Sequence, residues 1–418
     1  MTETVIRDFL QYGKVSDAIR ILQEFKQQNL PNIVIELGKF FKTIFPKHTD
    51  LLLQICQNTT GNFEFVYDTM SEITDMNITE PIFSNISCVM ALCIPHISNR
   101  YIEYNPKIVQ KILNRPINNY PIITFTITTC KRYDLFEKTM NSFLNCCMDI
   151  EKIDKWLCVD DNSNEDDRKK MQENYPFIEF YFKTFTEKGH PQSMNIIREK
   201  VTTPYIFHME DDWKFVSRKN YITHCMDVIS QSDKIGQCLI NKNYSETEKD
   251  VKIIGGVLNR TNAGTRYFLH QYCATKEEYD LFYKSHGCIG ANCAYWKHFS
   301  LRPSLLKKHI LTELGPYNEK ISHFEAEYSD KYLNAGYISA FLDGIYSLHI
   351  GRLTSERFDQ NKANAYILNG EKQLGGKEEA IAANYVSLNV TIYVLNLDRR
   401  PDRWTTFINH EEPKCLNY

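Results

Sequence analysis

Three consecutive acids follow an apolar run in the segment TPYIFHMEDDWKF, which ends at Phe215. Glu210, Asp211 and Asp212 repel one another and raise each other's pKa unless a cation compensates their charge. Mg²⁺ and Mn²⁺ are oxygen-seeking ions that such carboxylates hold together with substrate phosphates. From these residues alone, a metal site and a solvated acidic turn are equally good interpretations.

A second acidic pair follows another apolar run, in DKWLCVDDNSNEDD. Asp160 and Asp161 come directly after the expected strand Trp156 to Val159. In an open α/β sheet the ligand crevice lies beyond the carboxyl ends of the strands. We therefore expect both acid groups at one edge of a sheet, which a solvated turn explains less easily than a single cluster.

Strand and helix patterns alternate along the middle of the chain and predict the elements that position these acids. The β-branched run Ile122 to Thr129 predicts a buried strand, and EFYFKTF and PYIFHM predict two more. LFEKTMNSFLNCC and PQSMNIIREKV have helical spacing. This alternation predicts an α/β fold with a mostly parallel central sheet.

The first part of the chain, residues 1–116, predicts an α-helical domain. FLQYGKVSDAIRILQEFKQ has helical spacing around a Gly13 turn and resembles one tetratricopeptide-type hairpin. A plain helical cap or interaction domain explains the pattern as well as a repeat does. We expect this region to offer a surface for a protein partner.

The composition is that of a globular protein with two or three domains: 418 residues, 43% hydrophobic and 24% charged. The 49 basic and 52 acidic side chains nearly balance, so the basic excess of a nucleic-acid-binding protein is missing. No apolar run approaches the ~20 residues of a membrane-spanning helix. Scattered cysteines and the polar start of the chain predict a reduced protein of the cytoplasm.

From about Tyr120 to Arg352 the sequence resembles a glycosyltransferase of the GT-A fold, closest in motif order to the family-2 type. Five motifs carry the resemblance, in this order: TFTITTCKRYDLFEKTMNSFL, VDDNS, KGHPQSMN, HMEDDW and HFEAEYSDKYLNAGY. The resemblance implies a Rossmann-like catalytic domain at residues 117–370, which follows the helical domain. It also implies Mn²⁺ or Mg²⁺ as the cofactor.

The same resemblance implies roles for individual residues. Those expected to contact the nucleotide are Thr128, Thr129, Arg132, Asp160, Asp161, Gly189, Asn195, Asp211 and Arg352. Those expected at the metal are Asp212 as the direct ligand, with Glu210 and His349. Those expected to act as the catalytic base are Glu325 or Glu327, and those expected at the acceptor are Trp296 and Asn292. Without the resemblance, the acidic helix is a solvated face, and His349 and Trp296 are packed side chains.

The last part of the chain, residues 371–418, contains a second resemblance. VTIYVLNLDRRPDRWTTF, which begins at Val390, is similar to the opening of the collagen-type galactosyltransferases of family 25. The segment is too short to form a catalytic unit with its own core. We predict a linker followed by a truncated segment of that family, a combination that resembles chains of large DNA viruses, which would place the protein in the host cytoplasm.

Together these features predict a metal-dependent hexosyltransferase that moves a sugar from a nucleotide-sugar to a hydroxyl group of a glycan or protein. The donor that we predict first is a UDP-sugar. Two alternatives stay open. The acids could serve a nuclease or phosphotransferase, or the chain could be a non-catalytic module that binds a nucleotide or a protein.

Overall fold

The computed structural model describes residues 99–241, 256–272, 297–321 and 323–351, single positions within 64–97 and 275–281, and residues 368–369. These residues belong to a compact unit that ends at Asn369. The predicted segment 371–418 lies outside the described residues, as does most of the predicted helical domain.

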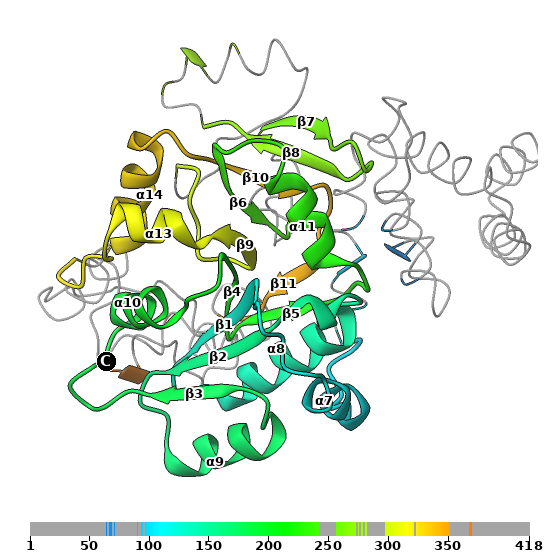
Figure 1. Cartoon of the computed structure of the whole chain (residues 1–418), viewed down its shortest axis with the longest axis vertical. Coiled ribbons are helices and arrows are strands. Elements are labelled where there is room, and N and C mark those ends of the chain that lie inside the picture. The colour runs from blue at the N-terminus through cyan, green and yellow to red at the C-terminus, as the bar shows by residue number, and fades with distance from the viewer. Residues whose placement is uncertain are drawn as a thin grey trace, which may run out of the picture. The chain divides into compact units, whose positions relative to one another are not determined.

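The described strands form one nine-stranded sheet and one two-stranded sheet (Figure 1). The large sheet has the order β3-β2-β1-β4-β9-β6-β10-β8-β7, and the small sheet pairs β5 with β11. The strand bounds are β1 Ile123–Thr129, β2 Lys155–Asp160, β3 Glu179–Phe182, β4 Tyr205–Glu210, β5 Trp213–Phe215, β6 Ile235–Leu239, β7 Gly256–Arg260, β8 Arg266–His270, β9 Ser304–Lys307, β10 Ile338–Leu342 and β11 Ser347–His349.

The helices that connect and cover these strands match the predicted pattern in the middle of the chain. Their bounds are α7 Pro106–Leu113, α8 Tyr133–Cys146, α9 Glu165–Asn174, α10 His190–Lys200, α11 Tyr221–Ile229, α13 Lys308–Leu314 and α14 Phe324–Asn334, with a short 3₁₀ turn at Ile150–Lys152. Among the described helices, none is long and apolar enough to cross a membrane.

The α/β class is confirmed, but the sheet is mixed rather than mostly parallel. Strands β3, β2, β1 and β4 run parallel, in the order found in one half of doubly wound nucleotide-binding folds. In the other half, β9 is antiparallel to both β4 and β6, and β8 is antiparallel to both β10 and β7. The sequence pattern did not reveal this half, because short strands carry no sign of their direction.

The pairing register places the predicted acids at one edge. Thr129 pairs with Asp160 and Thr128 with Glu210, so β1, β2 and β4 end side by side. The small sheet then pairs Trp213 with His349 and carries the late histidine to the acid triplet. The predicted convergence of the two acid groups at a sheet edge is therefore confirmed.

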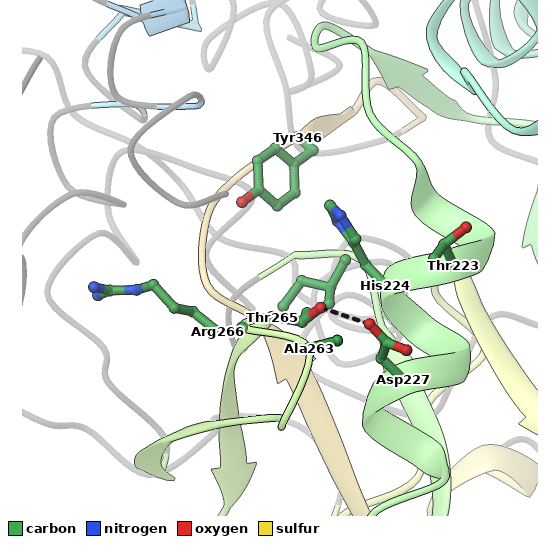
Figure 2. A pocket seen from close by; sticks show the side chains of 9 residues that line it. Thr223, His224, Asp227, Ala263, Thr265, Arg266 and Tyr346 are labelled. Carbon is green, nitrogen blue, oxygen red and sulfur yellow. Dashed lines mark hydrogen bonds between the residues drawn. The ribbon is translucent and has the colours of Figure 1, made fainter. Parts of the chain in front are cut away.

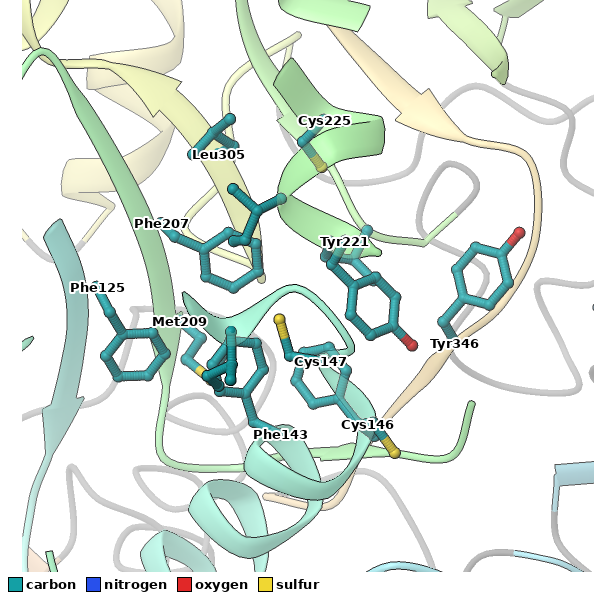
Figure 3. Packing of buried hydrophobic residues seen from close by; sticks show 14 of the residues in the cluster. Phe125, Phe143, Cys146, Cys147, Phe207, Met209, Tyr221, Cys225, Leu305 and Tyr346 are labelled. Atoms are coloured by element: carbon teal, nitrogen blue, oxygen red, sulfur yellow. The ribbon is translucent and has the colours of Figure 1, made fainter. Parts of the chain in front are cut away.

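Apolar side chains cover both faces of the sheet, as a buried parallel sheet requires. On one face α8 and α11 pack, and on the other α10, α13 and α14 pack (Figure 1). On the first face the ring of Phe143 stacks between Phe125 of β1 and Phe207 of β4, at centroid distances of 5.0 and 5.3 Å (Figure 3). Every residue of β1 is buried, so the strand that leads to the site is fixed on both sides.

A few described residues of the N-terminal part contact this core. The Tyr67 hydroxyl donates to the carbonyl of Ile345 at 2.7 Å, and Lys219 Nζ donates to the carbonyl of Ser71 at 2.8 Å. These contacts tie the first part of the chain to the loops that flank β5 and β11. The tetratricopeptide-like pattern itself lies outside the described residues.

Candidate functional site

The acid triplet spans the end of β4 and the turn into β5. Glu210 is the last residue of β4, and Asp211 and Asp212 form the turn before Trp213. Asp211 is fully buried and Asp212 is 6% exposed, whereas Glu210 is partly exposed. A solvated turn would expose these carboxylates, so their burial requires partners that compensate their charge.

Arg132 supplies that compensation. Its Nη1 donates to Asp212 Oδ2 at 3.1 Å and its Nε to Asp211 Oδ2 at 3.3 Å, while its Nη2 donates to Asp211 Oδ1. Its guanidinium is itself buried, so one cation and two anions share a desolvated site. Arg132 was expected at the nucleotide, and in this structure it contacts the two acids.

The hydrogen bonds of Asp211 go to neighbouring parts of the protein and hold the turn after β4 in place. It accepts hydrogen bonds from Thr129 Oγ1 at 2.7 Å and from the Cys130 amide at 3.3 Å. Its own carbonyl accepts from Thr139 Oγ1 of α8 at 2.7 Å. Asp211 and Thr129, both expected at the nucleotide, therefore join β1, β4 and α8 to one another.

Within the described part of the chain, Asp212 presents the one carboxylate oxygen of this pair that has no hydrogen-bond partner. Its Oδ2 is bonded to Arg132 and lies 3.4 Å from His349 Nε2, whereas the buried Oδ1 makes no hydrogen bond. Burial opposes ionisation here, but His349 and Arg132 outweigh it and hold the pKa of Asp212 well below its usual value. Asp212 is therefore an anion with one oxygen available.

Backbone geometry keeps His349 and Asp212 together. The rings of His349 and Trp213 stack at 4.8 Å across the β5–β11 pair, and the Ile350 amide donates to the Asp212 carbonyl at 2.9 Å. A Cβ at Gly351 would lie 1.9 Å from Asp212 Oδ2. Only glycine allows the chain to pass this close to the carboxylate.

These donors fit a divalent cation in part. Among the described residues, no group of three or more His, Cys, Asp or Glu side chains is arranged to hold a metal. The side chains of Asp212 and His349 do lie together, through Oδ2 and Nε2 at 3.4 Å, and Mg²⁺ is commonly bound by one or two protein ligands plus substrate phosphates. The structure thus brings together two members of the expected metal set and leaves Glu210 beside them.

Glu210 lies next to the start of α10. Its Oε1 is 3.8 Å from His190 Nδ1, a residue that the sequence analysis did not select. Burial, followed by the charges of Asp212 and Glu325, raises the pKa of Glu210. His190 is the first residue of α10 after Gly189, so the KGHPQSMN motif already contained it.

His190 is held neutral. Burial, followed by the charge of Lys183, lowers the pKa of His190 to about 4. Its ring meets Phe324 edge-on at 5.2 Å, and its Nε2 is buried without a hydrogen-bond partner. The sequence signal for this residue was its position directly after the glycine that begins α10.

The two acids at the end of β2, Asp160 and Asp161, accept hydrogen bonds from the neighbouring loops and from α9. Asp160 Oδ2 accepts from Arg168 Nε at 2.7 Å and from the Ser163 amide at 3.2 Å, and burial raises its pKa. Asp161 Oδ2 accepts from the Gly189 amide at 2.8 Å, and Lys183 Nζ lies 3.0 Å from it. Both acids were expected to hold a base or ribose.

Gly189 and Asn195 position the loop before α10 and the segment that leads to α14. Gly189 has a φ of 108°, which favours glycine, and its amide is turned to Asp161. Asn195 Nδ2 donates to the Tyr317 carbonyl at 3.0 Å, and the Tyr317 amide donates back to Asn195 Oδ1 at 2.8 Å. Thr128 is buried at the end of β1.

The two base candidates on α14 have different surroundings. Glu325 Oε1 accepts from the Leu301 amide at 2.9 Å, and its charge acts on Glu210, so it lies on the side of the acids. Glu327 Oε1 forms an ion pair with Lys331 at 3.3 Å, one turn further along the helix. Positions i and i+2 of a helix do not face the same way. The geometry favours Glu325.

Three predicted site residues, Asn292, Trp296 and Arg352, lie outside the described residues. A separate cavity of about 240 Å³ lies between α11, the β7–β8 turn and the link from β10 to β11 (Figure 2). Thr265 Oγ1 donates to Asp227 Oδ2 at 3.0 Å across it. None of the predicted site residues that the structure describes lines this cavity.

No protein-family model matches the sequence, and no curated protein sequence matches it. Among solved structures, the chain resembles the mannosyltransferase PcManGT from Pyrobaculum calidifontis in complex with GDP-Man and Mn²⁺, with 10% identity, 84% of this chain and 94% of that chain covered, and a TM-score of 0.38. It resembles GalNAc-T7 with UDP, GalNAc and Mn²⁺, with 14% identity, 55% of this chain and 45% of that chain covered, and a TM-score of 0.37.

A third similar structure is S. aureus TarS 1-349 in complex with UDP-GlcNAc, with 12% identity, 65% of this chain and 68% of that chain covered, and a TM-score of 0.36. The chain spans less than half of the GalNAc-T7 chain. TM-scores at this level do not establish a shared family.

Proposed function

We propose that the chain is a glycosyltransferase that moves a sugar from a nucleotide-sugar to a hydroxyl group, with a divalent cation at the acid triplet. The observation that carries the proposal is the carboxylate of Asp212. It is buried and ionised, one of its oxygens has no hydrogen-bond partner among the residues that the structure describes, and His349 lies beside it. The order of the five sequence motifs supports the same function.

The proposed roles follow from the contacts. Asp212 Oδ1 and His349 would hold Mn²⁺ or Mg²⁺, and Arg132 together with Asp211 orients Asp212. The bound ion would supply Lewis-acid stabilisation of the leaving diphosphate. The carboxyl edge of β1, β2 and β4 would receive the nucleotide, because ligands of such sheets bind beyond the strand ends. UDP is the nucleotide that we propose.

Glu325 is the proposed general base. It lies on the side of Glu210 and takes a proton from the acceptor hydroxyl as the new bond to the sugar forms. Glu327 is tied to Lys331 and serves as the matched comparison. We expect Glu325→Gln to lower kcat by about 10²–10⁴, and Glu327→Gln to leave it within a factor of a few.

The test of the proposal is Asp212→Asn. The amide keeps an oxygen for Arg132 but removes the anion, so we expect Mn²⁺ binding in an electron paramagnetic resonance titration and hydrolysis of UDP-sugars to be lost together. The free energy of unfolding should fall by no more than about 2 kcal/mol. Asp330→Asn, on the exposed face of α14, is the control. Mn²⁺ binding that survives Asp212→Asn would remove the proposed site.

One observation favours a non-catalytic nucleotide-binding protein as the second candidate. Arg132 already contacts both Asp211 and Asp212 and compensates part of their charge without a metal ion. In that case UDP binds, but no UDP-sugar is hydrolysed with Mn²⁺ or Mg²⁺. A panel of sugar nucleotides, assayed for release of the free sugar, separates the two functions without an acceptor.

A further inference from the structure

Residues 368–369 contact the part of the site where the base of the nucleotide is expected, around Asp161. Asn369 is 8% exposed, and its Nδ2 donates to Asp161 Oδ2 at 3.0 Å. Lys131 Nζ donates to the Leu368 carbonyl at 3.0 Å and to Asn369 Oδ1 at 3.3 Å. Lys188 Nζ donates to the Asn369 carbonyl at 3.3 Å. Groups from three loops therefore converge on two residues.

These contacts use up the hydrogen-bonding capacity of one oxygen of Asp161, Oδ2. Its Oδ2 lies within 3.0 Å of the Gly189 amide, Lys183 Nζ and Asn369 Nδ2. Its Oδ1 accepts from Asn162 Nδ2 at 2.9 Å. A carboxylate oxygen has two lone pairs, so Oδ2 has no acceptor position left for another molecule.

We propose that Asn369 is an internal occupant of the nucleotide-base position, and that a nucleotide must displace it to reach Asp161. This inference rests on the proposed function, whose nucleotide binds at the ends of β1 and β2. The carboxamide of Asn369 offers one N–H donor and one carbonyl acceptor side by side. The imide edge of uracil offers the same pair, and Asp161 and Lys131 are complementary to both.

The experiment compares the full chain with Asn369→Ala and Asn369→Asp. Alanine removes both competing side-chain hydrogen bonds, and aspartate places a second carboxylate against Asp161. We expect both variants to bind UDP with Mn²⁺ about tenfold more tightly than the natural chain in isothermal titration calorimetry. Asn334→Ala, at the exposed end of α14, is the matched control and should leave the affinity unchanged.

A second measurement reads the contact without any nucleotide. Lys131 should be acylated faster by an amine-reactive ester in Asn369→Ala than in the natural chain, measured by mass spectrometry against the exposed Lys169. The decisive comparison is Asn369→Ala against the natural chain, both without nucleotide. Bound UDP is left out of this measurement because its uracil would itself cover Lys131.

The outcomes separate the two proposals. UDP binding that Asn369→Ala leaves equal or weakens, or an unchanged acylation rate at Lys131, overturns the internal occupant and leaves the glycosyltransferase proposal standing. Absence of UDP binding in all four chains overturns the proposed function, and the competition with it. Tighter binding together with faster acylation supports the inference.

Discussion

At the scale of single residues, the site depends on a buried cation between two buried anions. Removing one partner of such a cluster leaves uncompensated charge in a desolvated place, which costs more than the cluster gained by forming. Arg132 holds Asp211 in place and binds Oδ2 of Asp212, while Oδ1 has no hydrogen-bond partner in the described ranges. Stability and ligand binding therefore depend on the same guanidinium.

We expect Arg132→Met to lower the free energy of unfolding by about 3–5 kcal/mol, measured by urea denaturation. Added Mn²⁺ should restore more stability to this variant than to the natural chain, because the ion replaces the missing positive charge. Lys169→Met removes an ion pair with Glu173 on the exposed side of α9 and should cost at most about 1 kcal/mol. A loss at Arg132 no larger than at Lys169 would contradict the role of the buried cluster.

At the scale of elements, α8 fixes the turn that carries the acids. Thr139 Oγ1 donates to the carbonyl of Asp211 at 2.7 Å and accepts from the amide of Trp213 at 3.0 Å, so it holds the backbone on both sides of Asp212. One helical turn later, Ser142 Oγ accepts from the amide of Phe215 at 2.9 Å. On the edge of β5 that does not pair with β11, side chains of α8 thus accept the hydrogen bonds that a neighbouring strand would accept.

We expect Thr139→Val to lower the free energy of unfolding by about 2–4 kcal/mol, because it leaves one buried carbonyl and one buried amide without partners. Mn²⁺ affinity should fall as well, since Asp212 lies between those two groups. Thr139→Ser keeps the hydroxyl and is the control, with both properties close to the natural chain. Chemical denaturation and Mn²⁺ titration of the two variants decide between them.

The sequence was sufficient for the elements whose pattern is local. The strand predicted at Ile122 to Thr129 is found at Ile123–Thr129, and the acids after β2 and β4 meet at one edge. The sequence was not sufficient where distant contacts decide. The three-residue strand β11, which brings His349 to Asp212, is too short for a periodic pattern, and the direction of Arg132 depends on where β4 ends.

At the scale of the whole molecule, several histidines are buried: His208 on β4, His270 on β8, and His298 before β9, whose ring lies 4.4 Å from that of His270. Burial lowers the pKa of His208 on β4 to about 3 and that of His298 to about 4, and it holds the pKa of His270 on β8 well below its usual value. Each stays neutral in the folded protein where the unfolded chain, with a pKa near ~6.5, takes up a proton. Their stabilising effect is therefore complete above about pH 6.5 and is lost as the pH falls toward 4.

We expect the free energy of unfolding to decrease between pH 6.5 and pH 5, with each histidine adding up to about 1.4 kcal/mol per pH unit to the slope. Urea denaturation at several pH values in this range measures it. Burial raises the pKa of Asp211 to about 6, so this carboxyl titrates in the same range with the opposite effect on stability, and the histidine contribution is read from a variant. His208→Gln should make the slope shallower by the contribution of that one side chain. A slope that this substitution leaves unchanged would show that His208 takes up its proton over the same pH range in the folded and the unfolded chain.

The antiparallel strand β9 also has a consequence for how the chain is made. β4 and β6 are not neighbours, because β9 lies between them and is translated after both. The roughly 60 residues between the end of β6 and β9 take several seconds to synthesise at about 5–20 residues per second. During that interval the edge of β4 next to the acids has no partner from the rest of the sheet, and unpaired edges invite aggregation. The rate of translation and the temperature of expression should therefore govern how much of this protein reaches its folded state.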